Sequence, residues 1–81
     1  MKVNILYFSS IKDTLKKSSE VFEFDKNIAV EDIIKYLKDR YPEISDKLDN
    51  VMVAVNEEYK DKSYKVNDGD VVALIPPVSG G

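Results

Sequence analysis

Two segments near the start of the chain predict β-strands, the first because it is rich in β-forming residues and the second because apolar and polar residues alternate along it. The segments are residues 2–8 and 20–25, and acidic side chains fill the polar positions of the second one. We expect the two strands to pair antiparallel. Phe8 falls on the face opposite the core candidates, so we expect it to be partly exposed. The predicted core-facing residues are Val3, Ile5 and Tyr7 in the first strand and Phe22 and Phe24 in the second.

A third segment repeats its apolar residues with the period of an α-helix. Between Val30 and Tyr41 they form one stripe, acidic residues occupy the first turn and basic residues come later, which suits the helix dipole. Pro42 then ends the helix. Ala29 is a poor N-cap residue, so we expect this end to fray or to borrow a cap from Asn27. A capping-box pattern at residues 10–13 predicts a second, short helix.

The remaining segments complete a sheet. Residues 51–56 are strongly apolar, which favours an interior strand, and residues 71–75 form the last strand. Asp68 and Asp70 lie in a turn signal around Gly69, and because the rest of a calcium loop is missing we interpret them as turn residues, not as metal ligands. The weaker elements are a helical turn within 43–50, a turn or short strand at 57–59 and a brief strand at 64–66.

The order of these elements predicts an α+β fold. The first and last strands carry almost no charge, so both are expected at the centre of the sheet, where they would run parallel as neighbours. One amphipathic helix must cover one face of this mixed sheet. This is the β-grasp arrangement, as in ubiquitin. We expect a single domain over residues 1–75 and a flexible C-terminal tail over residues 76–81.

Composition narrows the classes of function. The chain has 81 residues, a net charge of −3, no Cys and no His. An acidic domain is a poor candidate for binding a nucleic-acid backbone. The absence of Cys and His removes thiolate nucleophiles, zinc fingers and the usual proton carrier. We see no signal peptide and no membrane span, and together with the missing Cys this leads us to expect a cytoplasmic protein.

The ending of the chain carries its most distinctive chemistry. Gly80 and Gly81 present a terminal carboxylate with no side chain beside it, and Pro76 and Pro77 interrupt the sheet before them. Such an arm can enter a channel that is too narrow for other residues. The rest of the chain shows no nucleophile-and-base arrangement. We therefore expect the protein to be non-catalytic alone, with the catalytic groups on its partners.

Several motifs resemble the small subunits of molybdopterin synthase, a family of ubiquitin-like sulfur carriers. The resemblance covers essentially the whole chain, and its ending is the most specific part. Ile75 departs from the pattern because an aromatic residue is common there, which could alter a partner contact. The motifs are Ile5-Leu6-Tyr7-Phe8, Ala54-Val55-Asn56, Asp68-Gly69-Asp70-Val71-Val72-Ala73 and Pro76-Pro77-Val78-Ser79-Gly80-Gly81.

The resemblance implies a reaction cycle centred on the Gly81 carboxylate. An adenylating enzyme would activate it with ATP, and a sulfur donor would convert the acyl-adenylate to a thiocarboxylate. The tail would then insert into the large synthase subunit and give sulfur to a pterin precursor, building the dithiolene that later holds molybdenum or tungsten. The protein itself would bind no cofactor. The tail residues that would insert are Pro76, Pro77, Val78, Ser79 and Gly80.

Docking on these partners is expected to use the sheet face opposite the main helix. Alternation places Val71, Ala73 and Ile75 of the last strand outward, with Phe8 on the same side. Tyr59 occupies a position that contributes a contact side chain in the resembled family. The predicted partner-binding residues are thus Phe8, Tyr59 and Ile75.

Three other interpretations stay open at this level. The same tail could form isopeptide bonds to lysines, as a ubiquitin-like protein modifier. A thiamine-pathway sulfur carrier shares the fold and the chemistry, although such chains usually lack the Pro-Pro-Val-Ser segment. An inert β-grasp interaction module is disfavoured by the Gly-Gly ending. Intact mass and immunoblots for conjugates would distinguish these classes.

Overall fold

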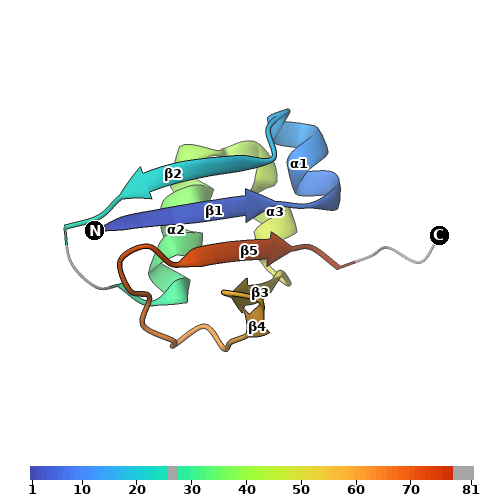
Figure 1. The fold of residues 1–81 in the computed structure, drawn as a ribbon. Helices are drawn as coiled ribbons and strands as arrows, with labels where there is room; N and C mark the ends of the chain where they lie inside the picture. Colours follow the sequence, from blue (N-terminus) through green and yellow to red (C-terminus); the bar gives the residue numbers. More distant parts are fainter. Residues whose placement is uncertain (26–27, 78–81) are drawn as a thin grey trace.

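The computed structural model describes residues 1–25 and 28–77, which build a five-stranded mixed sheet with helices packed on one side (Figure 1). The strand order is β2-β1-β5-β3-β4. The strands are β1 (Lys2–Tyr7), β2 (Ser19–Glu23), β3 (Met52–Val55), β4 (Glu58–Tyr59) and β5 (Val71–Ile75). The helices are α1 (Ser9–Leu15), α2 (Val30–Arg40), the 3-10 helix η1 (Pro42–Ile44) and α3 (Ser45–Leu48).

The first and last strands are parallel neighbours at the centre of the sheet, as predicted. β1 pairs with β5 in a register that sets Asn4 opposite Val71 and Leu6 opposite Ala73. β2 pairs antiparallel with the other edge of β1, and β3 pairs antiparallel with β5. This topology confirms the β-grasp fold. It also places the start of the C-terminal tail beside the end of β1.

One core lies between the sheet and α2. The apolar stripe of α2 supplies Ile33, Ile34 and Leu37, all buried, and alternate residues of the strands meet them. The strand residues in this core include Val3, Ile5, Tyr7, Phe22, Val53, Val55, Val72 and Leu74. The predicted inward faces of β1 and β5 are therefore correct. Phe24 lies just beyond β2 and is only half-buried against the core.

The contacts that the structure shows at the first residues of α1 and α2 differ from the caps that the sequence predicted. Ser10 is not a cap, because α1 begins at Ser9 and the carbonyl of Phe8 accepts the amide of Ile11. At α2 the cap comes from inside the helix, since the Asp32 carboxylate accepts the Ala29 amide at 3.0 Å. That acidic residue satisfies one of the free amides at the helix start. Asn27, the expected donor of a cap, lies outside the described residues.

Residues 64–66 do not form the brief strand that was expected. They make a single antiparallel bridge between Lys65 and Ala29. The amide of Val30 bonds to the carbonyl of Tyr64, and the amide of Val66 bonds to the carbonyl of Ile28. The segment therefore pairs with the chain that enters α2, away from the main sheet. A turn lies just before it, where the Asp61 carboxylate accepts the Ser63 amide.

Candidate docking surface

The outer face of the sheet, opposite α2, carries a row of small and large apolar side chains. Across the strands, Leu6 lies opposite Ala73, Ala73 opposite Ala54, and Ala54 opposite Tyr59. Directly paired residues point to the same side of a sheet. Two alanines thus lie between two larger side chains. This sequence of sizes hollows the face at its centre.

The hollow is a shallow depression with a volume of about 530 Å³. Its lining is mostly apolar, and Glu57 is the one charged residue in it. Figure 1 shows the sheet face on the side away from α2, which no described helix covers. The residues that line the depression are Leu6, Phe8, Ala54, Asn56, Glu57, Val71 and Ala73. We call this lining, together with Tyr59, Ile75 and Met52, the outer patch.

The predicted partner-binding residues all lie on or beside this face. Phe8 is 41% exposed and lines the depression, and Tyr59 is 66% exposed at the far end of the row. Ile75 is half-buried and pairs with the exposed Met52, so it lies outside the depression but on the same side. Their role in docking remains a prediction. Sequence reasoning missed Leu6, Ala54 and Met52, which the alternation of β1 and β3 could have indicated.

The Asp68–Asp70 turn fixes one end of this surface. The Asp70 carboxylate accepts the Asn56 side-chain amide at 2.9 Å, and the Asn56 oxygen in turn accepts the Val71 backbone amide at 3.0 Å. Asp68 accepts the backbone amide of Lys2. Asp68 therefore accepts a backbone amide, and Asp70 accepts the Asn56 side chain and the Asn67 backbone amide, which supports their interpretation as turn residues. No group of three or more acidic side chains within residues 1–25 and 28–77 is placed to hold a metal ion.

The β3–β4 hairpin turn sets the position of Glu57. Val55 pairs with Glu58, and the two residues between them have φ angles of 51° (Asn56) and 73° (Glu57). Positive φ at both central positions is the mark of a type I′ turn, in which Asn is favoured first and Gly second. Asn56 suits its place. Glu57 occupies a conformation that a residue with a Cβ rarely adopts.

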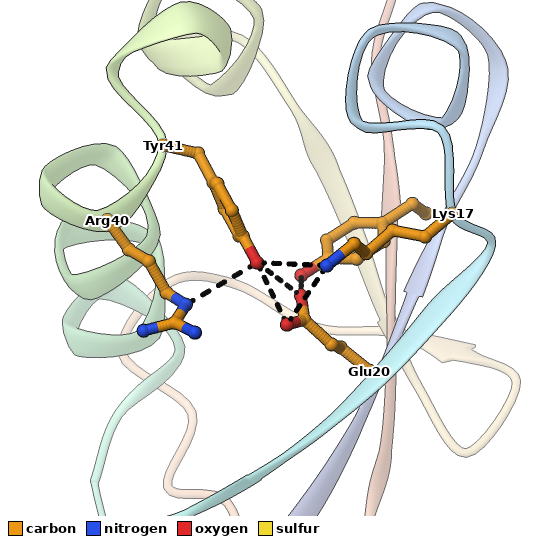
Figure 2. Close-up of polar contacts among 5 residues, drawn as sticks. Lys17, Glu20, Arg40 and Tyr41 are labelled. Atoms are coloured by element: carbon orange, nitrogen blue, oxygen red, sulfur yellow. Dashed lines mark hydrogen bonds and ion pairs between the residues drawn. The ribbon is translucent and has the colours of Figure 1, made fainter.

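A polar cluster lies at the other end of the sheet and was not foreseen from the sequence. The Tyr7 hydroxyl donates to Glu20 at 2.8 Å, and the Tyr41 hydroxyl donates to both Glu20 oxygens at 2.9 and 2.8 Å. Figure 2 shows Lys17 and Arg40 converging on the same Tyr41 hydroxyl. The cluster joins β1, β2, the end of α2 and the loop after α1.

The contacts within the cluster shift the pKa values of Glu20 and Tyr7. Partial burial acts to raise the pKa of Glu20, but hydrogen bonds from Tyr7 and Tyr41 and the nearby Lys17 ammonium outweigh it and lower that pKa. Burial raises the pKa of the Tyr7 hydroxyl, and its bond to the Glu20 carboxylate raises it further. Glu20 is therefore held as a carboxylate and Tyr7 as a neutral phenol. Neither group faces the outer patch, so we assign the cluster a structural role.

The first two residues of the predicted tail are the last ones that the structure describes. Pro76 is buried and Pro77 is exposed, directly after Ile75 of β5. The other predicted tail residues, Val78, Ser79, Gly80 and Gly81, lie outside the described residues. In the parts of the chain that the structure covers, no helix has the length and apolar character needed to cross a membrane.

Known proteins resemble this chain over nearly its full length. A molybdopterin synthase sulfur carrier subunit from Dictyostelium discoideum is 39% identical over 80 residues, covering 95% of this chain and 93% of that protein. Its counterpart from Mycobacterium tuberculosis is 34% identical over 100% of this chain and 99% of its own length. Among solved structures, a putative molybdopterin converting factor subunit 1 from Pyrococcus furiosus superposes with a TM-score of 0.83 at 29% identity, covering 96% of this chain and 99% of that one.

The family model agrees with this likeness. The match begins within β1 and runs through the glycine pair, so it includes the second half of β1, the other four strands, the outer patch and the tail. The Dictyostelium relative and the Pyrococcus structure cover similar shares of this chain, 95% and 96%. The model is that of the ThiS family, and it matches residues 5–81 of this chain. The chain therefore belongs to the ThiS family.

Proposed function

We propose that this protein is the sulfur carrier subunit of a molybdopterin synthase and carries sulfur as a thiocarboxylate on Gly81. The observation that carries the proposal is the 39% identity over 95% of the chain to a relative with that name. The same name on the relative that is 34% identical favours this function over the thiamine-pathway alternative. The Gly-Gly ending supplies the reactive group that such a carrier needs.

The chemistry follows from the weakness of a carboxylate as an acyl donor. Direct attack on Gly81 would have to expel an oxide, so the carboxyl group needs activation. An oxygen of the Gly81 carboxylate bonds to the α-phosphorus of ATP, and pyrophosphate leaves. Sulfide delivered by the sulfur donor then attacks the acyl carbon, AMP leaves with the acyl–phosphate bond broken, and the loss of one proton gives the thiocarboxylate. Because the chain has no Cys, the terminus is the natural place for covalently carried sulfur.

The partners in this scheme are an ATP-dependent activating enzyme, a sulfur donor system and the large synthase subunit. We assign docking on the large subunit to the outer patch. Val71, Ala73 and Ile75 of β5 belong to this patch, and the tail follows β5 directly. A partner docked on the outer patch therefore lies next to the start of the tail. This arrangement suits insertion of residues 76–81 into the partner's active site.

Intact-mass analysis of the protein purified from its native host tests the carrier function. We expect a population in which one oxygen is replaced by sulfur, and a variant that lacks Gly81 should lose it. Isopeptide conjugates of higher mass on immunoblots, without any thiocarboxylate form, would favour a protein modifier instead.

Binding measurements with the purified large subunit test the docking surface. Phe8→Ala and Ile75→Ala should weaken the complex while thermal unfolding stays near that of the wild type, because both side chains lie on the outer side of the sheet. Unchanged affinity in both variants would exclude the outer patch.

A further inference from the structure

The charge at the rim of the depression suggests how a partner is selected. Seven residues line the depression, and only Asn56 and Glu57 offer polar side chains. The Asn56 amide is already engaged, since it donates to Asp70 and its oxygen accepts the Val71 amide. That leaves the Glu57 carboxylate as the polar group available to a partner.

Glu57 has no ion-pair or side-chain hydrogen-bond partner among the residues that the structure describes. Its neighbour Glu58 is paired with Lys60 at 3.2 Å, and the Lys60 ammonium also lies over the Tyr64 ring. None of the residues that line the depression is basic. The depression therefore combines an apolar floor with one uncompensated negative charge.

The backbone of Glu57 adopts a strained conformation at the rim of the depression. Glu57 has a φ of 73° in a turn position that favours Gly. Strain of this kind persists where the surrounding structure fixes it, and it is concentrated at functional sites. The hydrogen bonds of Asn56 on both sides fix the turn. The backbone that carries the charge is thus fixed at the rim before any partner arrives.

We propose that Glu57 recognises a lysine or arginine on the protein that docks over the depression. The partner segment would insert an apolar side chain above Ala54 and Ala73 and place the basic group at the Glu57 rim. Such a pair excludes partners that present an acidic group at the same place. This inference rests on the proposed docking of the large synthase subunit on the outer patch.

The test compares the binding of charge variants to the purified large subunit. Glu57→Gln should raise the dissociation constant about 3–10-fold, as for a partly exposed ion pair, and Glu57→Lys should raise it about 10–100-fold. Wild-type affinity should also fall more steeply with added salt than that of Glu57→Gln. Glu58→Gln is the matched control, because it removes the same charge one residue away. Its affinity should stay within about twofold of the wild type.

A second variant separates charge from backbone strain. Glu57→Gly relieves the positive φ and removes the carboxylate. Its midpoint of thermal unfolding should rise by about 4–8 °C, while its affinity falls as in Glu57→Gln. A purely structural role for Glu57 would not produce stabilisation together with weaker binding. Rescue of Glu57→Lys by an acidic substitution on the large subunit would identify the paired residue.

The outcomes distinguish this inference from the docking proposal on which it rests. If Phe8→Ala loses binding but the Glu57 variants bind like the wild type, docking stands and the charge role is wrong. Equal losses of affinity in Glu57→Gln and Glu58→Gln would also overturn the charge role, since the overall negative charge of the protein would explain both. If the wild type does not bind, or if Phe8→Ala and Ile75→Ala bind normally, the docking proposal fails and this inference fails with it.

Discussion

Glu20 holds together parts of the chain that are distant in sequence. It accepts hydrogen bonds from Tyr7 and Tyr41, which are 13 and 21 residues away, and it pairs with Lys17 at 3.4 Å. Tyr7 is buried, so its hydroxyl needs an acceptor to offset the loss of water. Glu20 supplies this acceptor at the edge of the core. Its side chain is only 20% exposed, which limits the screening of these bonds.

Replacing Glu20 should make stability depend less on pH. The folded-state pKa of Glu20 lies below its ordinary value, so its contribution to stability is present above the unfolded-state pKa. The contribution is lost as the pH falls through the lowered folded-state pKa. Glu20→Gln should therefore lower the free energy of unfolding by about 1–3 kcal/mol at pH 7, a range typical of bonds to charged groups. The difference from the wild type should shrink on acidification.

Urea denaturation at a series of pH values from 7 to 3 would measure this effect. Glu23→Gln is a suitable control, because Glu23 lies on the same strand and is exposed. The free energy of unfolding of Glu23→Gln should differ little from that of the wild type at every pH. If the loss of unfolding free energy in Glu20→Gln stays constant over the pH series, the stabilising role assigned to the Glu20 carboxylate is wrong.

Periodicity predicted most elements of this fold, because it reports directly on which side of an element is buried. The stripe of α2 and the inward residues of β1 and β5 follow from periods of 3.6 and 2. The segment 64–66 shows the limit of this reasoning. Its residues suit a strand, but its partner is the chain before α2, and only tertiary structure decides that pairing.

The candidate site was predictable only in part for a similar reason. Alternation indicated that Phe8 and the outward residues of β5 share one face. The depression, however, arises from the cross-strand register that aligns Ala54 with Ala73. The role of Asn56 and the strained position of Glu57 depend on a two-residue turn whose geometry is set by pairing of Val55 with Glu58. A single sequence does not specify that register.

The packing of α2 gives a prediction at the scale of an element. Leu37 is fully buried between the helix and the sheet, so Leu37→Ala leaves a cavity. We expect a loss of about 2–5 kcal/mol in the free energy of unfolding, measured by denaturant titration. Lys35→Ala, an exposed change on the same helix, should alter it by less than about 0.5 kcal/mol. A loss for Leu37→Ala below about 1 kcal/mol would mean that the buried face of the helix is misassigned.

The alanine floor of the depression gives a second prediction at this scale. Ala73→Leu adds an outward side chain between Leu6 and Ala54, where it fills the hollow without entering the core. We expect the melting temperature to stay near that of the wild type and the affinity for the large subunit to fall at least about 10-fold, since the added bulk collides with the docked partner. Isothermal titration calorimetry would measure the change.

Lys35→Leu is the matched control, because it adds the same side chain on α2, in the other layer of the molecule. It should leave the affinity unchanged. Equal affinity of Ala73→Leu and the wild type would show that the partner does not occupy the depression.

At the scale of the whole molecule, the proposed function divides the chain into a docking body and a reactive end. In this proposal the acidic body and the apolar outer patch would serve association, and the catalytic groups for adenylation and sulfur transfer would belong to the partners. The central pairing of β1 with β5 anchors the start of the tail to the middle of the sheet. The distance from the docking surface to the terminus is therefore set by the number of tail residues.

This dependence on length makes Gly81 the most informative position for a deletion. Removing Gly81 leaves Gly80 with a chemically similar carboxylate, but one that is about 3.3–3.6 Å short along an extended backbone. That gap is too large for the carboxylate to reach a fixed phosphate, so ATP–pyrophosphate exchange with the cognate activating enzyme should be abolished. One residue added after Gly81 should fail as well, because its carboxylate would pass the reacting position.

Binding of the large subunit provides the control for both length variants. The outer patch lies on the folded body, so docking should survive each change while exchange is lost. Near-normal exchange by the protein that lacks Gly81 would refute the terminal mechanism. Loss of exchange together with loss of binding would show instead that the tail supplies the affinity, and the assignment of docking to the outer patch would then be wrong.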